Sequence, residues 1–187
     1  KNFFQLLEKD DPSRYSKHFL IFNDLNYLSS FPFYSENDRW FRYLRDIYLT
    51  QIKYHQIMDY LMYENNFDIA LAKNILFMSE EDVIDIDKKG HTIGLHSFSH
   101  PTKMSKLSIH KQRIEYQKNY EHLSRLIGKP IKTMSHPCGS YNKDTLSILT
   151  KLNIDIGFRS SLCPNNVRSS LEIPREDQAN IFKKMNK

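Results

Sequence analysis

The sequence predicts an α/β fold in which parallel strands are covered by helices, preceded by a helical N-terminal region. Two patterns lead to this prediction. Residues 36–63 carry apolar side chains at near-helical spacing. From residue 79 onward, helix-like and strand-like segments alternate, which is typical of parallel strands joined by helices. We therefore expect a helical region or insertion at residues 1–78 and an α/β region at residues 79–187, together forming one domain.

The N-terminal region is expected to consist of helices and loops. Ser35 is suited to cap a helix over residues 36–63, because its hydroxyl can accept a hydrogen bond from an N–H of the first turn. Asn65 and Asn66 end the helical pattern, and a shorter apolar segment follows at residues 67–77. The apolar positions that define the helix are Trp40, Phe41, Leu44, Ile47, Tyr48, Ile52, Ile57 and Leu61.

Capping signals and glycines divide the second region into elements. Ser79 begins a helix with a pattern like a capping box, and Gly90 ends it in the position that tolerates left-handed backbone. Ser108 is expected to cap a second helix that ends at Gly128, and residues 142–152 form a third. The expected strands are residues 92–95, 131–134 and 154–158.

Polar residues follow each of the expected strands. They are His96 with His100, the loop of residues 135–141, and the segment after Phe158. In folds of this class, ligands bind beyond the carboxyl ends of parallel strands. We therefore expect a functional site where these three segments meet.

The composition limits the classes of function. Hydrophobic residues make up 40% of the 187 residues and charged residues 26%, as in ordinary soluble domains. The net charge of +5 can indicate a nucleic-acid partner, but Lys and Arg are dispersed beyond pairs such as Lys88-Lys89. Cys138 and Cys163 are too few for a disulfide framework, and no segment approaches the roughly 20 apolar residues of a transmembrane helix. We expect neither a nucleic-acid partner nor a membrane span.

His96 and His100 form a candidate metal site. In a helix or tight turn, a spacing of four residues places both imidazoles on one side, so that they can share an ion. Imidazole suits Zn²⁺, Co²⁺ or Ni²⁺, and such an ion can polarise a carbonyl group. The alternative is two polar surface histidines, since the chain contains eight His.

The context of this pair resembles the polysaccharide deacetylase family, the NodB-like carbohydrate esterases. Residues 90–100 follow the family's second motif, G-H-x-[IL]-x-x-H-[ST]-x-x-H, and Leu107-Ser108 supplies the helix start that comes next. Residues 135–142 resemble the third motif, R-x-P-Y-G followed by a helix. The resemblance covers roughly residues 79–181 and implies a partial or distorted (β/α) barrel of the NodB type.

The resemblance also implies roles for single residues. His96 and His100 would bind Zn²⁺, or Co²⁺ or Ni²⁺, and the backbone N–H of Cys138 would help to hold an oxyanion. Ser135 stands where the family has Arg, so the charge of that Arg is absent. The substrate-binding candidates are His136, Pro137 and Tyr141.

Residues 173–177 are similar to a late Pro-Arg-x-Asp element found in some surface-glycan members of the family. Arg175 and Asp177 would orient the catalytic carboxylate or fix the substrate. A solvated charge cluster is the alternative interpretation.

The chain departs from the family at its first and last motifs. The T-F-D-D-G motif, which supplies the base and a third metal ligand, is absent, and neither Asp10-Asp11 nor Asn23-Asp24 replaces it. No His follows His136, so the family's late Leu-x-x-His is absent too. The chain begins at Lys1 without an initiator Met, and we expect an N-terminally incomplete barrel with an exposed strand edge, which favours aggregation or association.

The resemblance implies a metal-dependent hydrolase that removes N-acetyl groups from the amino sugars of a bacterial surface polysaccharide. It would reside in the cytoplasm or in a compartment that the sequence leaves open, and its oligomeric state is not predicted. Because the Asp motif is absent, a non-catalytic glycan-binding pseudoenzyme is the alternative. A basic protein that stacks single-stranded nucleic acid on its aromatic residues ranks below both.

Overall fold

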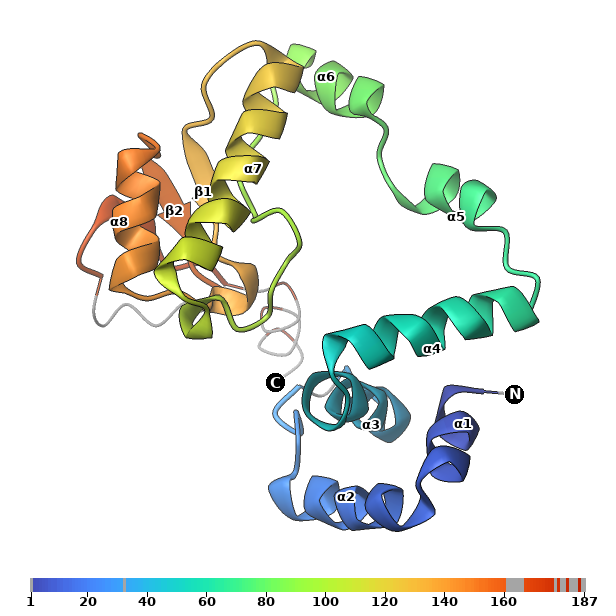
Figure 1. Ribbon diagram of the computed structural model, residues 1–187. Coiled ribbons are helices and arrows are strands. Elements are labelled where there is room, and N and C mark those ends of the chain that lie inside the picture. Colours follow the sequence, from blue (N-terminus) through green and yellow to red (C-terminus); the bar gives the residue numbers. More distant parts are fainter. Residues whose placement is uncertain are drawn as a thin grey trace. The chain divides into compact units, whose positions relative to one another are not determined.

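The structure is a computed structural model that describes residues 2–31, 33–160 and 167–176, and residues 178, 181 and 185. The chain divides into two compact units, Lys1–Phe77 and Met78–Lys187 (Figure 1). None of the helices in the described part is both long and apolar enough to cross a membrane.

The N-terminal unit is helical. The predicted continuous helix over residues 36–63 is wrong, because Leu49 adopts an extended backbone (φ −95°, ψ 151°) and Thr50 caps a new helix by accepting from the Lys53 N–H. Ser35 caps its helix as predicted, in a reciprocal capping box. The elements are α1 (Phe3–Asp10), α2 (Pro12–Leu25), α3 (Glu36–Tyr43), the π-helical η1 (Leu44–Tyr48), α4 (Gln51–Glu64) and α5 (Ile69–Leu76).

Aromatic rings dominate the core of this unit, and several of their polar atoms are paired. Trp40 Nε1 donates to Tyr15 Oη at 2.9 Å, and His18 Nδ1 lies 3.0 Å from Tyr43 Oη. These pairs remove the cost of burying unmatched polar groups. The fully packed residues are Phe3, Leu7, Phe22, Trp40, Tyr43, Leu44 and Tyr48.

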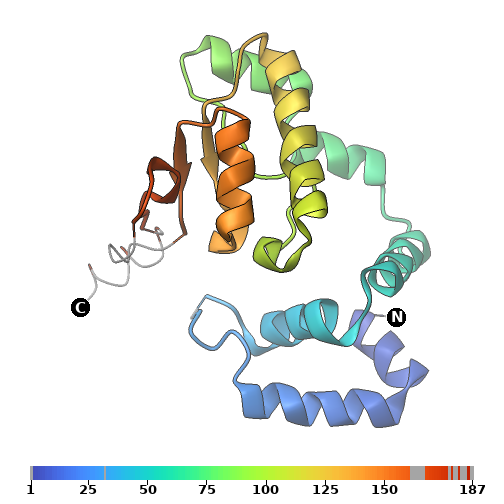
Figure 2. The same ribbon diagram turned by 60° about the vertical axis from the view of Figure 1, so that its left-hand side comes forward.

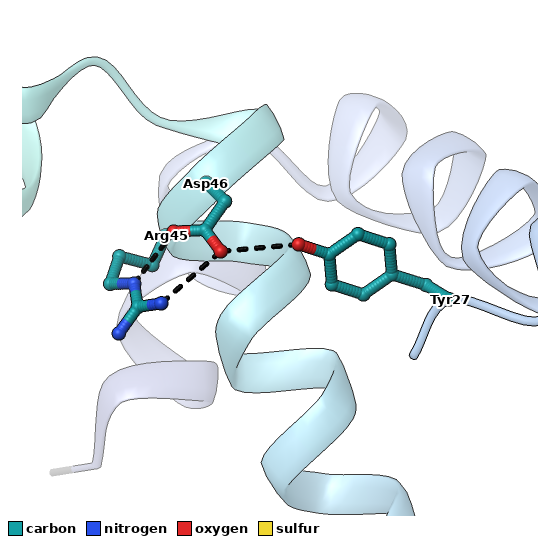
Figure 3. Close-up of polar contacts among 3 residues, drawn as sticks. All are labelled: Tyr27, Arg45 and Asp46. Atoms are coloured by element: carbon teal, nitrogen blue, oxygen red, sulfur yellow. Dashed lines mark hydrogen bonds and ion pairs between the residues drawn. The ribbon is translucent and has the colours of Figure 1, made fainter. Parts of the chain in front are cut away.

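A carboxylate connects η1 to the turn after α2 (Figure 3). Asp46 accepts from Tyr27 Oη at 3.1 Å and from Arg45 Nε at 2.7 Å. Burial and the Asp46 carboxylate raise the pKa of Tyr27 to about 12, so the phenol stays a hydrogen-bond donor at neutral pH. The contact fixes a turn whose Leu28 has a positive φ of 57°.

The C-terminal unit contains a small parallel sheet. Met134 of β1 pairs with Gly157 of β2, and single bridges join Leu95 to β1 and Ile173 to β2. The predicted α/β character is confirmed, whereas the predicted barrel is not, because the described residues form only two strands and these bridges. The elements are α6 (Glu80–Lys88), η2 (Met104–Lys106), α7 (Ile109–Ile127), β1 (Thr133–Ser135), η3 (Pro137–Gly139), α8 (Lys143–Lys151), β2 (Ile156–Phe158) and η4 (Ser170–Glu172).

Helices α7 and α8 lie side by side on one face of this sheet (Figures 1 and 2). Leu95 and Met134 point toward the helices and are buried with Tyr116 and Leu149. Strand residues alternate in direction, so Gly94, Thr133 and Phe158 line a cleft of about 570 Å³. This cleft continues to the carboxyl ends of the strands, where the candidate site lies.

Candidate functional site

The two predicted metal ligands come together in the loop after the Leu95 bridge. The ring centroids of His96 and His100 are 4.9 Å apart, with the rings inclined by 51°. Both side chains are exposed. The loop turns through left-handed backbone at Ser97 (φ 64°) and His100 (φ 55°), which brings the second ring back to the first.

The tautomer of His96 follows from its partner. Its Nδ1 lies 2.8 Å from the backbone carbonyl oxygen of Ser135, which can only accept, so Nδ1 carries the proton and donates. The Nε2 lone pair is then available to a metal, as in metal sites where a carbonyl orients the ligating imidazole. This pair therefore fits a divalent ion, although no third His, Cys, Asp or Glu within the described residues completes a cluster.

The second predicted segment forms a tight turn directly after β1. Gly139 N donates to His136 O at 3.0 Å, and Ser140 N donates to Pro137 O at 2.9 Å. Cys138 adopts a positive φ of 51°, and its side chain is exposed. Gly139 is required by its φ of 64° and by the Ser160 side chain, which occupies the place of a Cβ.

His136, a predicted substrate-binding residue, lies inside the protein with 1% of its surface exposed. Its Nε2–H donates to the carbonyl of Leu171 at 2.8 Å, and its ring stacks on Tyr141 with centroids 4.3 Å apart. Burial lowers the pKa of His136, so the ring is neutral, and its Nδ1 has no hydrogen-bond partner in the described structure. The adjacent Pro137 is buried as well, and direct contact of either residue with substrate stays a prediction.

Tyr141 is engaged with a buried carboxylate. Its hydroxyl donates to Glu172 Oε1 at 3.0 Å, while Glu172 Oε2 accepts from Ser169 Oγ at 3.1 Å. Burial raises the pKa of Tyr141, and the nearby guanidinium of Arg159 opposes that shift. Tyr141 lines a second cavity, of about 440 Å³, between α8 and η4.

Arg175 follows the Ile173 bridge and shares the first cleft with His96, Ser135 and Phe158. Its side chain is exposed, so the guanidinium can reach a ligand in that cleft. Asp177, for which the resemblance implies the same role as for Arg175, lies outside the described residues.

Hydrogen bonds connect the segments that carry the two predicted motifs. Ser105, just after the histidine loop, donates its N–H to Ser140 Oγ at 3.1 Å. Its carbonyl accepts from Asn142 Nδ2, also at 3.1 Å. With the His96 contact to Ser135, these bonds hold the histidine loop against the Pro-Cys-Gly turn.

Three residues near the site were not identified from the sequence. Glu115 and Asn119 contact the histidine loop from α7, and Glu172 contacts Tyr141. On an amphipathic helix, polar residues such as Glu115 and Asn119 are indistinguishable from solvated ones by pattern alone. The available signal was their spacing of four positions, which places both side chains on the same face of the predicted helix.

Comparison with known families identifies the fold type. The family model of polysaccharide deacetylases matches residues 52–157, more than half of the chain. This match confirms the resemblance inferred from the motifs around His96 and Cys138.

Individual relatives are more distant. The uncharacterized protein YlxY of Bacillus subtilis is 31% identical over 103 residues, which are 54% of this chain and 28% of that protein. The structure of IcaB from Ammonifex degensii has a TM-score of 0.50 at 15% identity, over 58% of this chain and 52% of that one. The Streptococcus pyogenes deacetylase PplD, in complex with acetate, has a TM-score of 0.48 at 19% identity, over 58% and 50%. The chain thus spans about a quarter of the curated relative and about half of these two structures.

Proposed function

Because the chain belongs to the polysaccharide deacetylase family, we propose that its C-terminal unit contributes to a metal-dependent site that removes N-acetyl groups from amino sugars of a bacterial surface polysaccharide. One observation carries the proposal. Two exposed imidazoles lie with their ring centroids 4.9 Å apart at the carboxyl edge of a parallel sheet, and a backbone carbonyl orients the first of them. Metal-ligating imidazoles are commonly oriented by a carbonyl in this way, and this supports the proposal.

His96 and His100 would hold Zn²⁺, Co²⁺ or Ni²⁺. When bound, such an ion supplies Lewis-acid polarisation of the acetyl carbonyl and acidifies a water molecule. Residues of this chain would orient the ligands and stabilise the oxyanion. The Ser135 carbonyl keeps His96 in the ligating tautomer, and the backbone N–H of Cys138 would donate to the oxyanion that develops on the acetyl group.

The cleft beside His96 would receive the sugar. Arg175 lines it and offers a guanidinium to hydroxyl or carboxylate groups of the substrate. His136 and Tyr141 would support the oxyanion turn from beneath, since their rings stack on one another. A hydrolytic site also needs a general base, which in this family the resemblance assigns to an Asp. No third His, Cys, Asp or Glu among the described residues completes a metal cluster with the two imidazoles, so the proposal assigns this chain two ligands and the oxyanion turn only.

The test is acetate release from N-acetylated oligosaccharides with added Zn²⁺ or Co²⁺, using the full-length protein that contains this chain. We expect His96→Ala and His100→Ala each to lower the rate by about 100-fold or more, because each removes a metal ligand. His55→Ala, which removes an exposed imidazole of the N-terminal unit, is the matched control and should leave the rate unchanged. Full activity in both ligand variants would refute the proposal.

The second candidate is a glycan-binding domain without catalysis. It is favoured by the lack of a third ligand beside the pair within the described residues. It predicts that the full-length protein binds N-acetylated oligosaccharide, measured by calorimetry, and releases no acetate. Acetate release that depends on His96 would eliminate it.

A further inference from the structure

The histidine loop adopts a backbone that needs external support. Ser97 and His100 both have positive φ, which residues other than Gly rarely adopt. Such conformations persist only where the surroundings hold them. Most of the loop is exposed: Phe98, Ser99 and both imidazoles face solvent. Packing alone therefore does not explain the conformation of its backbone.

One carboxylate supplies much of this support. Glu115 Oε2 accepts from the backbone N–H groups of Phe98 at 3.1 Å and Ser99 at 2.8 Å. Its Oε1 accepts from Ser99 Oγ at 2.7 Å. Three donors from two consecutive residues thus converge on one ionised group, and hydrogen bonds to a charged acceptor are about twice as strong as neutral ones.

A second anchor lies one turn further along α7. Asn119 Oδ1 accepts from the backbone N–H of His96 at 3.0 Å. Residues i and i+4 lie on the same face of a helix. Asn119 and Glu115 therefore both face the histidine loop, and they hydrogen-bond to the two ends of the segment from His96 to Ser99. The position of α7 is itself fixed by packing, because its residues Gln112 and Tyr116 are fully buried.

We propose that Glu115 is the positioning residue of the histidine pair, with Asn119 as a second anchor. By fixing the backbone between His96 and His100, they keep the two imidazoles on one side of the loop, with their centroids 4.9 Å apart. This inference rests on the proposed function, in which the pair binds a metal ion. A Gln at position 115 would present only one acceptor oxygen and would turn an amide NH₂ group toward the donors, so the role requires a carboxylate.

The first test measures zinc affinity of the full chain by competition with a chromophoric chelator. We expect Glu115→Gln to weaken zinc binding by about 10- to 100-fold, the usual effect of losing a residue that supports a metal ligand. Ser99→Ala removes one of the three contacts and leaves the helix unaltered, so a smaller loss is expected. Glu121→Gln is the control, because Glu121 is an exposed acid of the same helix that pairs with Gln117.

The second test is independent of metal. Amide hydrogen exchange of Phe98 and Ser99 should be faster in Glu115→Gln than in the wild-type chain. It should be unchanged in Glu121→Gln, because Glu115 accepts from both N–H groups whereas Glu121 accepts from Gln117. Unchanged exchange at both amides, or wild-type zinc affinity in Glu115→Gln, would overturn the positioning role. If the wild-type chain binds none of Zn²⁺, Co²⁺ and Ni²⁺, the proposed function fails, and the exchange measurement still decides whether Glu115 holds the loop.

Discussion

The two units of the molecule differ in how their buried polar groups are hydrogen-bonded and in where their strained backbone lies. In the N-terminal unit, Trp40 pairs with Tyr15 and His18 pairs with Tyr43. In the C-terminal unit, Ser97 Oγ and His136 Nδ1 are buried and have no hydrogen-bond partner among the described residues. An unmatched buried polar group costs about 1–3 kcal/mol, so its presence calls for an explanation.

Left-handed backbone shows the same contrast. In the N-terminal unit, residues such as Asn26 and Asn66 adopt positive φ just after helices, where the turn requires it. In the C-terminal unit, Ser97, His100 and Cys138 adopt it inside the two loops of the candidate site. Local rules tend to be broken where function demands a particular geometry. This contrast supports the proposal that the functional site lies in the loops of the C-terminal unit, and we expect the aromatic core of the N-terminal unit to serve packing.

The largest expected effect tests the packing side of this comparison. Phe22→Ala should destabilise the N-terminal unit by about 3–5 kcal/mol, because Phe22 is buried against Trp40 and Tyr43. The single Trp40 reports the transition by fluorescence during urea unfolding. Phe19→Ala, at a ring that is 39% exposed, should cost less. At urea concentrations that leave it folded, Phe22→Ala should bind zinc as tightly as the wild-type chain. Weaker zinc binding in this variant would contradict the division of roles between the two units.

An intermediate effect tests the strain in the oxyanion turn. Gly139→Ala should lower the free energy of unfolding by about 1–2 kcal/mol through its positive φ, and by about 1–3 kcal/mol more through crowding against Ser160. Gly128→Ala is the matched control, since Gly128 also has a positive φ but open space around it. Urea unfolding followed by circular dichroism measures both. Equal losses would show that the turn is not constrained by its neighbours.

The smallest expected effect concerns the buried imidazole. Burial lowers the pKa of His136 below its unfolded value of about 6.5, so between these two pKa values the unfolded chain binds more protons than the folded one. The contribution of the buried neutral ring to the free energy of unfolding is thus fully present above pH 6.5. It is lost as the pH falls toward the folded-state pKa. Wild-type stability should decline more steeply than that of His136→Gln between pH 7 and pH 5, measured by urea unfolding. Identical slopes would contradict the burial of a neutral ring.

Signals that act within one turn of the chain were predictable from the sequence. The caps at Ser35, Ser79 and Ser108 form as expected, because each depends on residues within three positions. The left-handed end of α7 at Gly128 follows from the same short-range chemistry. The alternation of elements likewise predicted parallel strands, and the position of the loops at the carboxyl ends of these strands predicted that they meet.

Contacts between distant residues were decided only by the tertiary structure. The burial of His136 depends on the carbonyl of Leu171, 35 positions away, and the grip of Glu115 on Ser99 spans 16 positions. The extent of the sheet was decided in the same way, because strand pairing depends on which segments lie alongside. The sequence by itself determined that His96 and His100 lie together at a strand end. Only the packing of α7 and the Ser135 carbonyl determined how the rings are held, since these contacts come from residues that no local pattern connects to the pair.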